Sequence, residues 1–188
     1  MLLLIAGLVL FLGVHMLTTA RGTRAALMAR FGEGPYKGLY SIVSAVGLVL
    51  IVWGFGRYRS SGYIPVWDPP SGLLPITLVL MWFSFVALVA TYAPAGKIKG
   101  LLRHPMLVGV KAWALAHLLA NGDLGSIILF GAFLAWAVYD RIAVKRRGDN
   151  GAPPSGFTAG DAVSLLVGSA LYAAMFWLHP SLIGVPIV

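Results

Sequence analysis

Two histidines stand inside long stretches that carry almost no charge, His15 in FLGVHMLTT and His117 in WALAHLLA. An ionisable side chain inside a membrane-spanning stretch is costly, so each of them is a candidate functional residue. A neutral imidazole offers a nitrogen ligand for a metal, and haem iron in helical membrane bundles is often held by histidines from facing helices. Two histidines on different stretches fit that pattern. In the alternative interpretation, each imidazole only hydrogen-bonds a neighbouring helix.

Three more basic residues accompany His117. Arg103 and His104 precede Pro105, a residue that suits the first turn of a helix. These two could help to bind a cofactor, or they could contact lipid headgroups or cap the helix. Lys111 lies a third of the way into the stretch, where it could pair with an acidic group such as a haem propionate or extend to the membrane surface. His104 and His117 are about 140° apart around a straight helix, so we do not expect them to bind one atom together.

Other kinds of chemistry are excluded at the level of motifs. The chain has no cysteine, which rules out thiolate ligands and cysteine nucleophiles. HExxH, GxSxG, P-loop and GxGxxG patterns are also missing from the sequence.

The elements that position these residues must be membrane helices. Of the 188 residues, 59% are hydrophobic and 11% are charged, too few polar residues to cover a soluble domain. About 20 apolar residues are needed to cross a membrane core of ~30 Å, and the apolar runs do not alternate as barrel strands do. We therefore predict an all-α polytopic helix bundle, a single domain over residues 1–188 with about six transmembrane helices. The spans are 1–20, 38–56, 69–96, 104–122, 124–139 and 158–188, with 104–122 the weakest because Lys111 interrupts it.

The first stretch lacks the preceding basic residues and the small-residue cleavage pattern of a signal peptide, so we expect it to be a retained span. Basic residues then predict the orientation. The odd-numbered connections carry 11 of them and the even-numbered ones carry Arg57 and Arg59, which places the odd connections in the cytoplasm. The formal net charge of +8 is thereby explained without nucleic acid as a partner. The 11 are Arg21, Arg24, Arg30, Lys37, Lys97, Lys99, Arg103, Arg141, Lys145, Arg146 and Arg147.

The depths of the two histidines test whether they can share one iron. His15 lies ~6 Å to the cytoplasmic side of the middle of its span, and His117 lies ~6 Å to the outer side. Both imidazoles lean toward the midplane, because Cβ atoms tilt toward the helix N-terminus and the two spans run in opposite directions. Shared ligation then requires tilted or shifted helices. In the connections, we expect a tight turn at Gly32, Gly34 and Pro35. We expect Asp123, together with Asn121 and Gly122, to terminate the fourth helix.

Two blocks of the sequence resemble a known family. GVHMLTTARGTRAALMARFGEGPYKGLYSIVS and RHPMLVGVKAWALAHLLANGD are similar to the signature blocks of the NnrU family of bacterial membrane proteins, over Gly13 to Asp123. That family takes its name from a gene associated with denitrification. The chain also resembles 15-cis-zeta-carotene isomerase, a membrane protein that uses haem b to isomerise a polyene double bond.

The resemblance implies roles for particular residues. His15 and His117 match the positions proposed as axial haem ligands in the isomerase, so haem b is the implied cofactor. The implied setting is the bacterial inner membrane, with lipid, an apolar small molecule and a membrane protein as candidate partners. The implied activity is isomerase-like or belongs to nitrite and nitric oxide reduction.

Two other functions stay open. One is a non-enzymatic accessory role for nitrogen-oxide reductases. The other is a methyltransferase using S-adenosylmethionine, because RHPMLVG is similar to the RHPxYxG element of isoprenylcysteine carboxyl methyltransferases. Leu107 replaces the tyrosine of that element, and the paired acids expected after it are missing.

Overall fold

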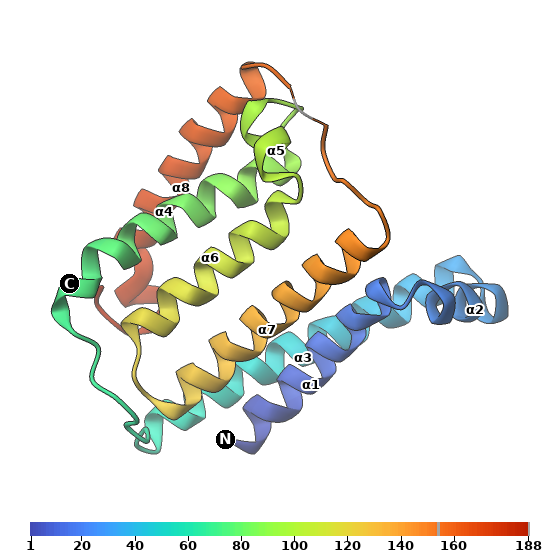
Figure 1. Ribbon diagram of the computed structural model, residues 1–188. Helices are drawn as coiled ribbons and strands as arrows, with labels where there is room; N and C mark the ends of the chain where they lie inside the picture. Colours follow the sequence, from blue (N-terminus) through green and yellow to red (C-terminus); the bar gives the residue numbers. More distant parts are fainter. Residues whose placement is uncertain (154, 188) are drawn as a thin grey trace. The chain divides into compact units, whose positions relative to one another are not determined.

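The computed structural model describes residues 1–153 and 155–187. In this part of the chain the secondary structure consists of helices, and no β-strand is formed (Figure 1). The predicted all-α class is confirmed. Apolar runs become helices because a helix satisfies its own backbone hydrogen bonds where no water is present. In chain order the helices are α1 (Leu2–Thr19), α2 (Arg21–Phe31), α3 (Glu33–Ser60), the 3-10 turn η1 (Ser71–Leu73), α4 (Leu74–Tyr92), α5 (Lys97–Leu102), α6 (Pro105–Ala120), α7 (Leu124–Arg146) and α8 (Ala159–Ile183).

Five segments of the described chain are long and apolar enough to cross a membrane: α1, α3, η1 with α4, α7 and α8. The predicted fourth span is the shorter apolar helix α6, whose 16 residues extend about 24 Å at 1.5 Å per residue. Side chains on the long helices are apolar where they face outward, as at Val9 (67% exposed), Val79 (63%) and Leu166 (73%). The protein is therefore a multi-pass membrane protein whose helices contact lipid.

The connections differ from the sequence-based expectation at three places. Helices α2 and α5 occupy segments that we expected to be loops. The tight turn is confined to Gly32, whose φ of 85° favours glycine, because Gly34 and Pro35 lie in the first turn of α3. Helix α6 ends at Ala120, directly before the expected stop at Asn121, Gly122 and Asp123. The Asp123 carboxylate has a further role: it accepts a hydrogen bond from the Ser126 amide (3.0 Å) and so caps the start of α7.

The described chain divides into two compact units. Unit 1 comprises residues 1–69 and 121–144, and unit 2 comprises residues 70–120 and 145–188. In unit 1, α1 and α3 lie side by side (Figure 1) and approach very closely at Gly7, Gly47 and Gly54. A Cβ on Gly7 would lie 2.6 Å from the amide nitrogen of Ile51, and a Cβ on Gly47 would lie 2.7 Å from that of Phe11. Backbone contact of this kind requires glycine, as is common where membrane helices pack.

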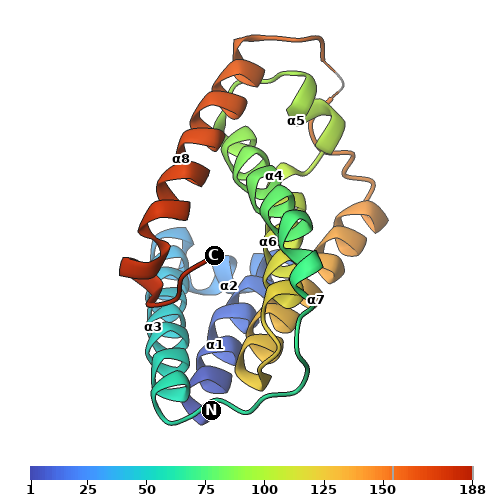
Figure 2. The same ribbon diagram turned by 90° about the vertical axis from the view of Figure 1, so that its left-hand side faces the viewer.

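In unit 2, α4 packs against both α6 and α8 (Figure 2). The Ser84 hydroxyl on α4 donates a buried hydrogen bond to the Gly109 carbonyl on α6 (2.8 Å). The Trp82 indole on α4 donates to the Ser169 hydroxyl on α8 (2.9 Å). Side-chain hydrogen bonds of this kind hold membrane helices together where the hydrophobic effect does not favour helix contact over lipid contact.

One carboxylate in unit 2 caps two helices. Asp161 is 1% exposed and accepts hydrogen bonds from the amides of Lys97 (3.0 Å), Ile98 (2.7 Å) and Thr158 (2.8 Å). The first two amides belong to the start of α5, and Thr158 is the N-cap of α8. The Thr158 side chain in turn accepts from the Gly160 amide (3.1 Å). Asp161 therefore ties the segment before α6 to the start of α8, satisfying amides that helix starts leave without partners.

Candidate functional site

His15 lies half-buried on α1, within a cluster of aromatic side chains from three helices of unit 1. Its ring stacks on Phe11, with centroids 4.2 Å apart, and lies 5.5 Å from the ring of Tyr40 on α3. The edge of Trp136 on α7 meets it at 5.9 Å. We name His15, Tyr36, Tyr40 and Trp136 the His15 cluster, since Tyr36 continues it at 6.3 Å from Tyr40.

A backbone hydrogen bond fixes which imidazole nitrogen of His15 carries the proton. The Nδ1 atom lies 2.6 Å from the Phe11 carbonyl oxygen. A carbonyl can only accept, so Nδ1 is the donor and the neutral ring keeps its lone pair on Nε2. Within the described chain, Nε2 of His15 has no hydrogen-bond partner. The imidazole therefore presents a metal-ligating nitrogen inside an apolar, aromatic environment.

His117 repeats the same local arrangement in unit 2. Its Nδ1 atom donates to the carbonyl of Trp113, four residues earlier (2.9 Å), and its ring lies 5.3 Å from the Trp113 ring. Both segments, FLGVH and WALAH, thus place an aromatic residue one helical turn before the histidine. The proton is again assigned to Nδ1, which leaves the lone pair of the neutral ring on Nε2.

The other two histidines do not share this arrangement. His179 on α8 donates from Nδ1 to the Val185 carbonyl, which lies beyond the helix (2.7 Å). His104 lies before α6 and uses Nε2 to contact the Asp149 carbonyl (3.2 Å). Among the four histidines, only His15 and His117 donate from Nδ1 to the carbonyl of an aromatic residue four positions earlier.

These two histidines fit the requirements of a haem ligand. Histidines that bind metals nearly always donate their other ring nitrogen to a carbonyl, carboxylate or water, which fixes the ring and raises its basicity. In the described residues, no group of three or more His, Cys, Asp or Glu side chains could hold a metal ion by protein ligands alone. A haem needs only one or two axial ligands, because the porphyrin supplies the other four.

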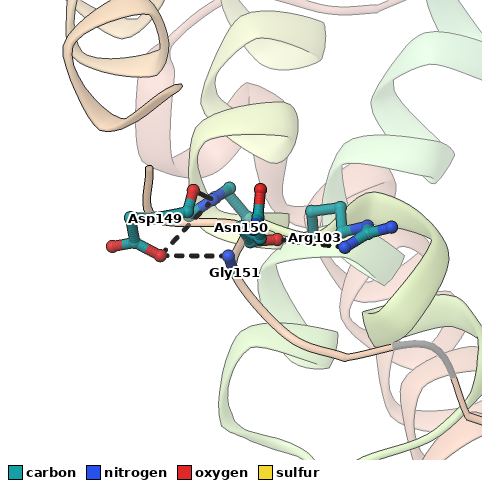
Figure 3. A network of polar contacts seen from close by, with 5 residues as sticks. Arg103, Asp149, Asn150 and Gly151 are labelled. Carbon is teal, nitrogen blue, oxygen red and sulfur yellow. Dashed lines mark hydrogen bonds and ion pairs between the residues drawn. The ribbon is translucent and has the colours of Figure 1, made fainter. Parts of the chain in front are cut away.

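Arg103 packs against the loop that precedes α8 (Figure 3), and His104 contacts the Asp149 carbonyl in the same loop. The Arg103 guanidinium contacts the Asn150 carbonyl (3.4 Å), and its own carbonyl accepts from the Ala152 amide (2.9 Å). Arg103 has a φ of 64°, an uncommon conformation for a residue other than glycine. A Cβ on Gly151 would collide with the Arg103 carbonyl, so the loop needs glycine there. These contacts give both side chains a structural role within unit 2 that needs no bound methyl donor.

The predicted site residues are therefore divided between the units. Arg103, His104, Lys111 and His117 lie on or just before α6 in unit 2, whereas His15 lies in unit 1. Lys111 is half-buried, and its proposed contact with an acidic cofactor group stays a prediction.

Sequence reasoning missed the partners of His15. No role was expected for Trp136, Tyr36 or Tyr40. The only signal was local: Tyr36 and Tyr40 are four residues apart, which places them on one face of a helix.

Compared with known protein families, the chain matches the family described as NnrU protein over residues 3–187. The chain belongs to the NnrU family. The match includes both signature blocks, and it extends beyond them to cover η1, α7 and α8 as well. No curated protein and no solved structure matches this NnrU-family chain.

Proposed function

We propose that this NnrU-family protein binds haem b, with His15 and His117 as its histidine ligands. The observation that carries the proposal is their shared local geometry, in which each Nδ1 donates to a backbone carbonyl one turn earlier. That geometry makes Nε2 the metal-binding nitrogen in both rings. The resemblance to a haem-dependent isomerase points to the same two positions.

The chain's own contribution is to hold and shield the imidazoles. Phe11 and Trp136 restrict the His15 ring from two sides, and the hydrogen bond from Nδ1 sets its orientation. Apolar surroundings exclude water and so strengthen electrostatic interactions at the site. When bound, haem supplies one-electron redox chemistry and, where a ligand position opens, a metal that can polarise a substrate. The activity class that we propose is isomerase-like conversion of an apolar, membrane-soluble molecule.

The proposed setting is the bacterial inner membrane, with the basic connections in the cytoplasm. Three segments support this orientation: α2, the region of α5, and the end of α7. In α2, Arg21 and Arg30 are exposed, and α2 buries none of its side chains. Excess Arg and Lys of this kind marks the cytoplasmic side of a membrane protein.

Absorbance spectra of the purified full-length protein test the proposal. Protein from haem-supplemented cells should show a Soret band, and His15→Ala and His117→Ala should each lower bound haem about ten-fold or more, or shift the band. His179→Ala is the matched control, because His179 also lies in a candidate span but lacks the shared arrangement. Added imidazole should restore the spectrum of His15→Gly.

Two results would contradict the proposal. One is a colourless wild-type protein after expression with sufficient haem. The other is an equal loss of haem in His179→Ala and His15→Ala, since that would indicate general damage to the fold. A colourless protein that co-purifies with a reductase complex would favour the accessory role instead.

A further inference from the structure

Two polar atoms of the His15 cluster are buried without a hydrogen-bond partner. They are the hydroxyl oxygen of Tyr36 and the indole nitrogen of Trp136, each with no partner among the described residues. The Tyr36 side chain is only 9% exposed. Buried polar groups are nearly always paired, because leaving one unpaired sacrifices the hydrogen bonds it made to water. A pair of such atoms in one cluster therefore calls for an explanation.

Ring contacts connect both residues to His15. The Trp136 ring meets the His15 ring edge-on at 5.9 Å, and Tyr36 reaches it through Tyr40 with ring spacings of 6.3 Å and 5.5 Å. These four residues come from α1, α3 and α7, all within unit 1. Helix packing therefore places one unpaired group, the Trp136 indole, next to His15 and the other, the Tyr36 hydroxyl, on the residue beyond Tyr40.

The chemistry of these atoms defines what they can bind. An indole N–H is only a donor, and a phenolic O–H donates readily to an anionic oxygen. Around them, Phe11, Tyr40 and Phe133 provide flat apolar surface, with Phe133 lying 5.8 Å from Phe11. A matching ligand is flat and apolar and carries acidic oxygens at its edge. Haem b has this form, since its two propionates extend from the porphyrin.

We propose that Tyr36 and Trp136 bind the cofactor directly, by donating hydrogen bonds to carboxylate oxygens of the haem that His15 ligates. This inference rests on the proposed haem binding and extends it to residues outside both histidine motifs. It assigns recognition of the haem carboxylates to two neutral hydrogen-bond donors within unit 1. Hydrogen bonds to a charged acceptor are stronger than those between neutral groups, so their loss is measurable.

Two variants that remove the polar atom provide the test: Tyr36→Phe removes only the hydroxyl, and Trp136→Phe removes the indole N–H with part of the ring. Tyr36→Phe and Trp136→Phe keep an aromatic ring, and Tyr92→Phe and Trp177→Phe are the matched controls at sites 81% and 78% exposed. Haem titration into the full-length protein should show about ten-fold weaker binding for each site variant and no change for the controls. Tyr36→Phe should also raise the melting temperature of the haem-free protein, because it removes an unpaired buried hydroxyl and keeps the ring.

A second ligand tests whether the haem carboxylates are the groups that Tyr36 and Trp136 bind. With the dimethyl ester of haem, whose propionates are neutral, the affinity difference between wild type and the site variants should shrink to about two- or three-fold.

The outcomes separate the two proposals. If the wild type binds haem and both site variants bind it equally well, the inference is wrong and haem binding stands. If Tyr36→Phe binds haem more weakly but also melts at a lower temperature without haem, it acts through the fold, and the inference is again wrong. If the wild type binds no haem, the proposed function fails and the inference fails with it.

Discussion

The close approach of α1 to α3 provides the most direct test of the fold. Gly54 on α3 faces the backbone of α1: a Cβ there would lie 2.7 Å from the Leu3 carbonyl carbon and 2.8 Å from the Leu4 Cα atom. Ordinary contacts of this kind are about 3.5–4.0 Å, so Gly54→Ala requires the helices to separate by roughly 1 Å. The helix backbones cannot rotate away as a flexible side chain can.

A control two residues away isolates the packing cost. Gly56 lies on the same helix, and a Cβ there would have no neighbour within 4 Å. Replacing glycine by alanine inside a helix favours the helix by up to about 1 kcal/mol, and this gain is common to both variants. The difference between them is therefore the cost of overpacking, which we expect to be about 1–3 kcal/mol. Gly54→Ala should lower the free energy of unfolding relative to Gly56→Ala by that amount.

Unfolding by sodium dodecyl sulfate in mixed micelles measures both variants. Tryptophan fluorescence and far-ultraviolet circular dichroism are suitable signals because the chain has six tryptophans and is helical. Equal unfolding free energies for Gly54→Ala and Gly56→Ala would show that α1 and α3 are not in backbone contact at this level. That result would refute the packing of unit 1 described above.

Two more predictions concern unit 2. Asp161→Asn should lower the thermal unfolding midpoint clearly more than Asp149→Asn, because Asp161 accepts three amide hydrogen bonds in a buried position and Asp149 is exposed; equal shifts in a thermal melt would contradict this. Gly151→Ala should loosen the turn at Arg103 and speed tryptic cleavage there, because its Cβ would collide with the Arg103 carbonyl. Gly148→Ala is the control, since Gly148 also has a positive φ but open space around it, and equal cleavage rates would rule out the clash.

The helices and their lipid environment follow from local properties of the sequence. A run of about 20 apolar residues spans the membrane core wherever the rest of the chain lies, so α1, α3, α4, α7 and α8 could all be predicted. The same reasoning identified α6 as the weakest span, and its helix is indeed the short one. The local arrangement of His15 and His117 is also set within one helical turn, because the accepting carbonyl is four residues away.

The surroundings of the site depend on contacts between distant segments. Trp136 contacts His15 although the two residues are 121 positions apart in the sequence. Asp140 and Thr19 are separated by the same number of positions, and the Asp140 carboxylate accepts a hydrogen bond from the Thr19 hydroxyl (2.8 Å). Asp161 likewise caps α5 from more than 60 residues away.

A physical reason explains why the sequence did not reveal these pairs. A soluble helix marks its inner face with an apolar stripe, whereas a helix in lipid is apolar on all sides, so its pattern does not show which face meets a neighbour. The sequence by itself determined the solvent, the helices and the two histidines. Only the tertiary structure decided that Tyr40 and Trp136 lie beside His15, because that depends on glycines and polar side chains whose partners lie on other helices.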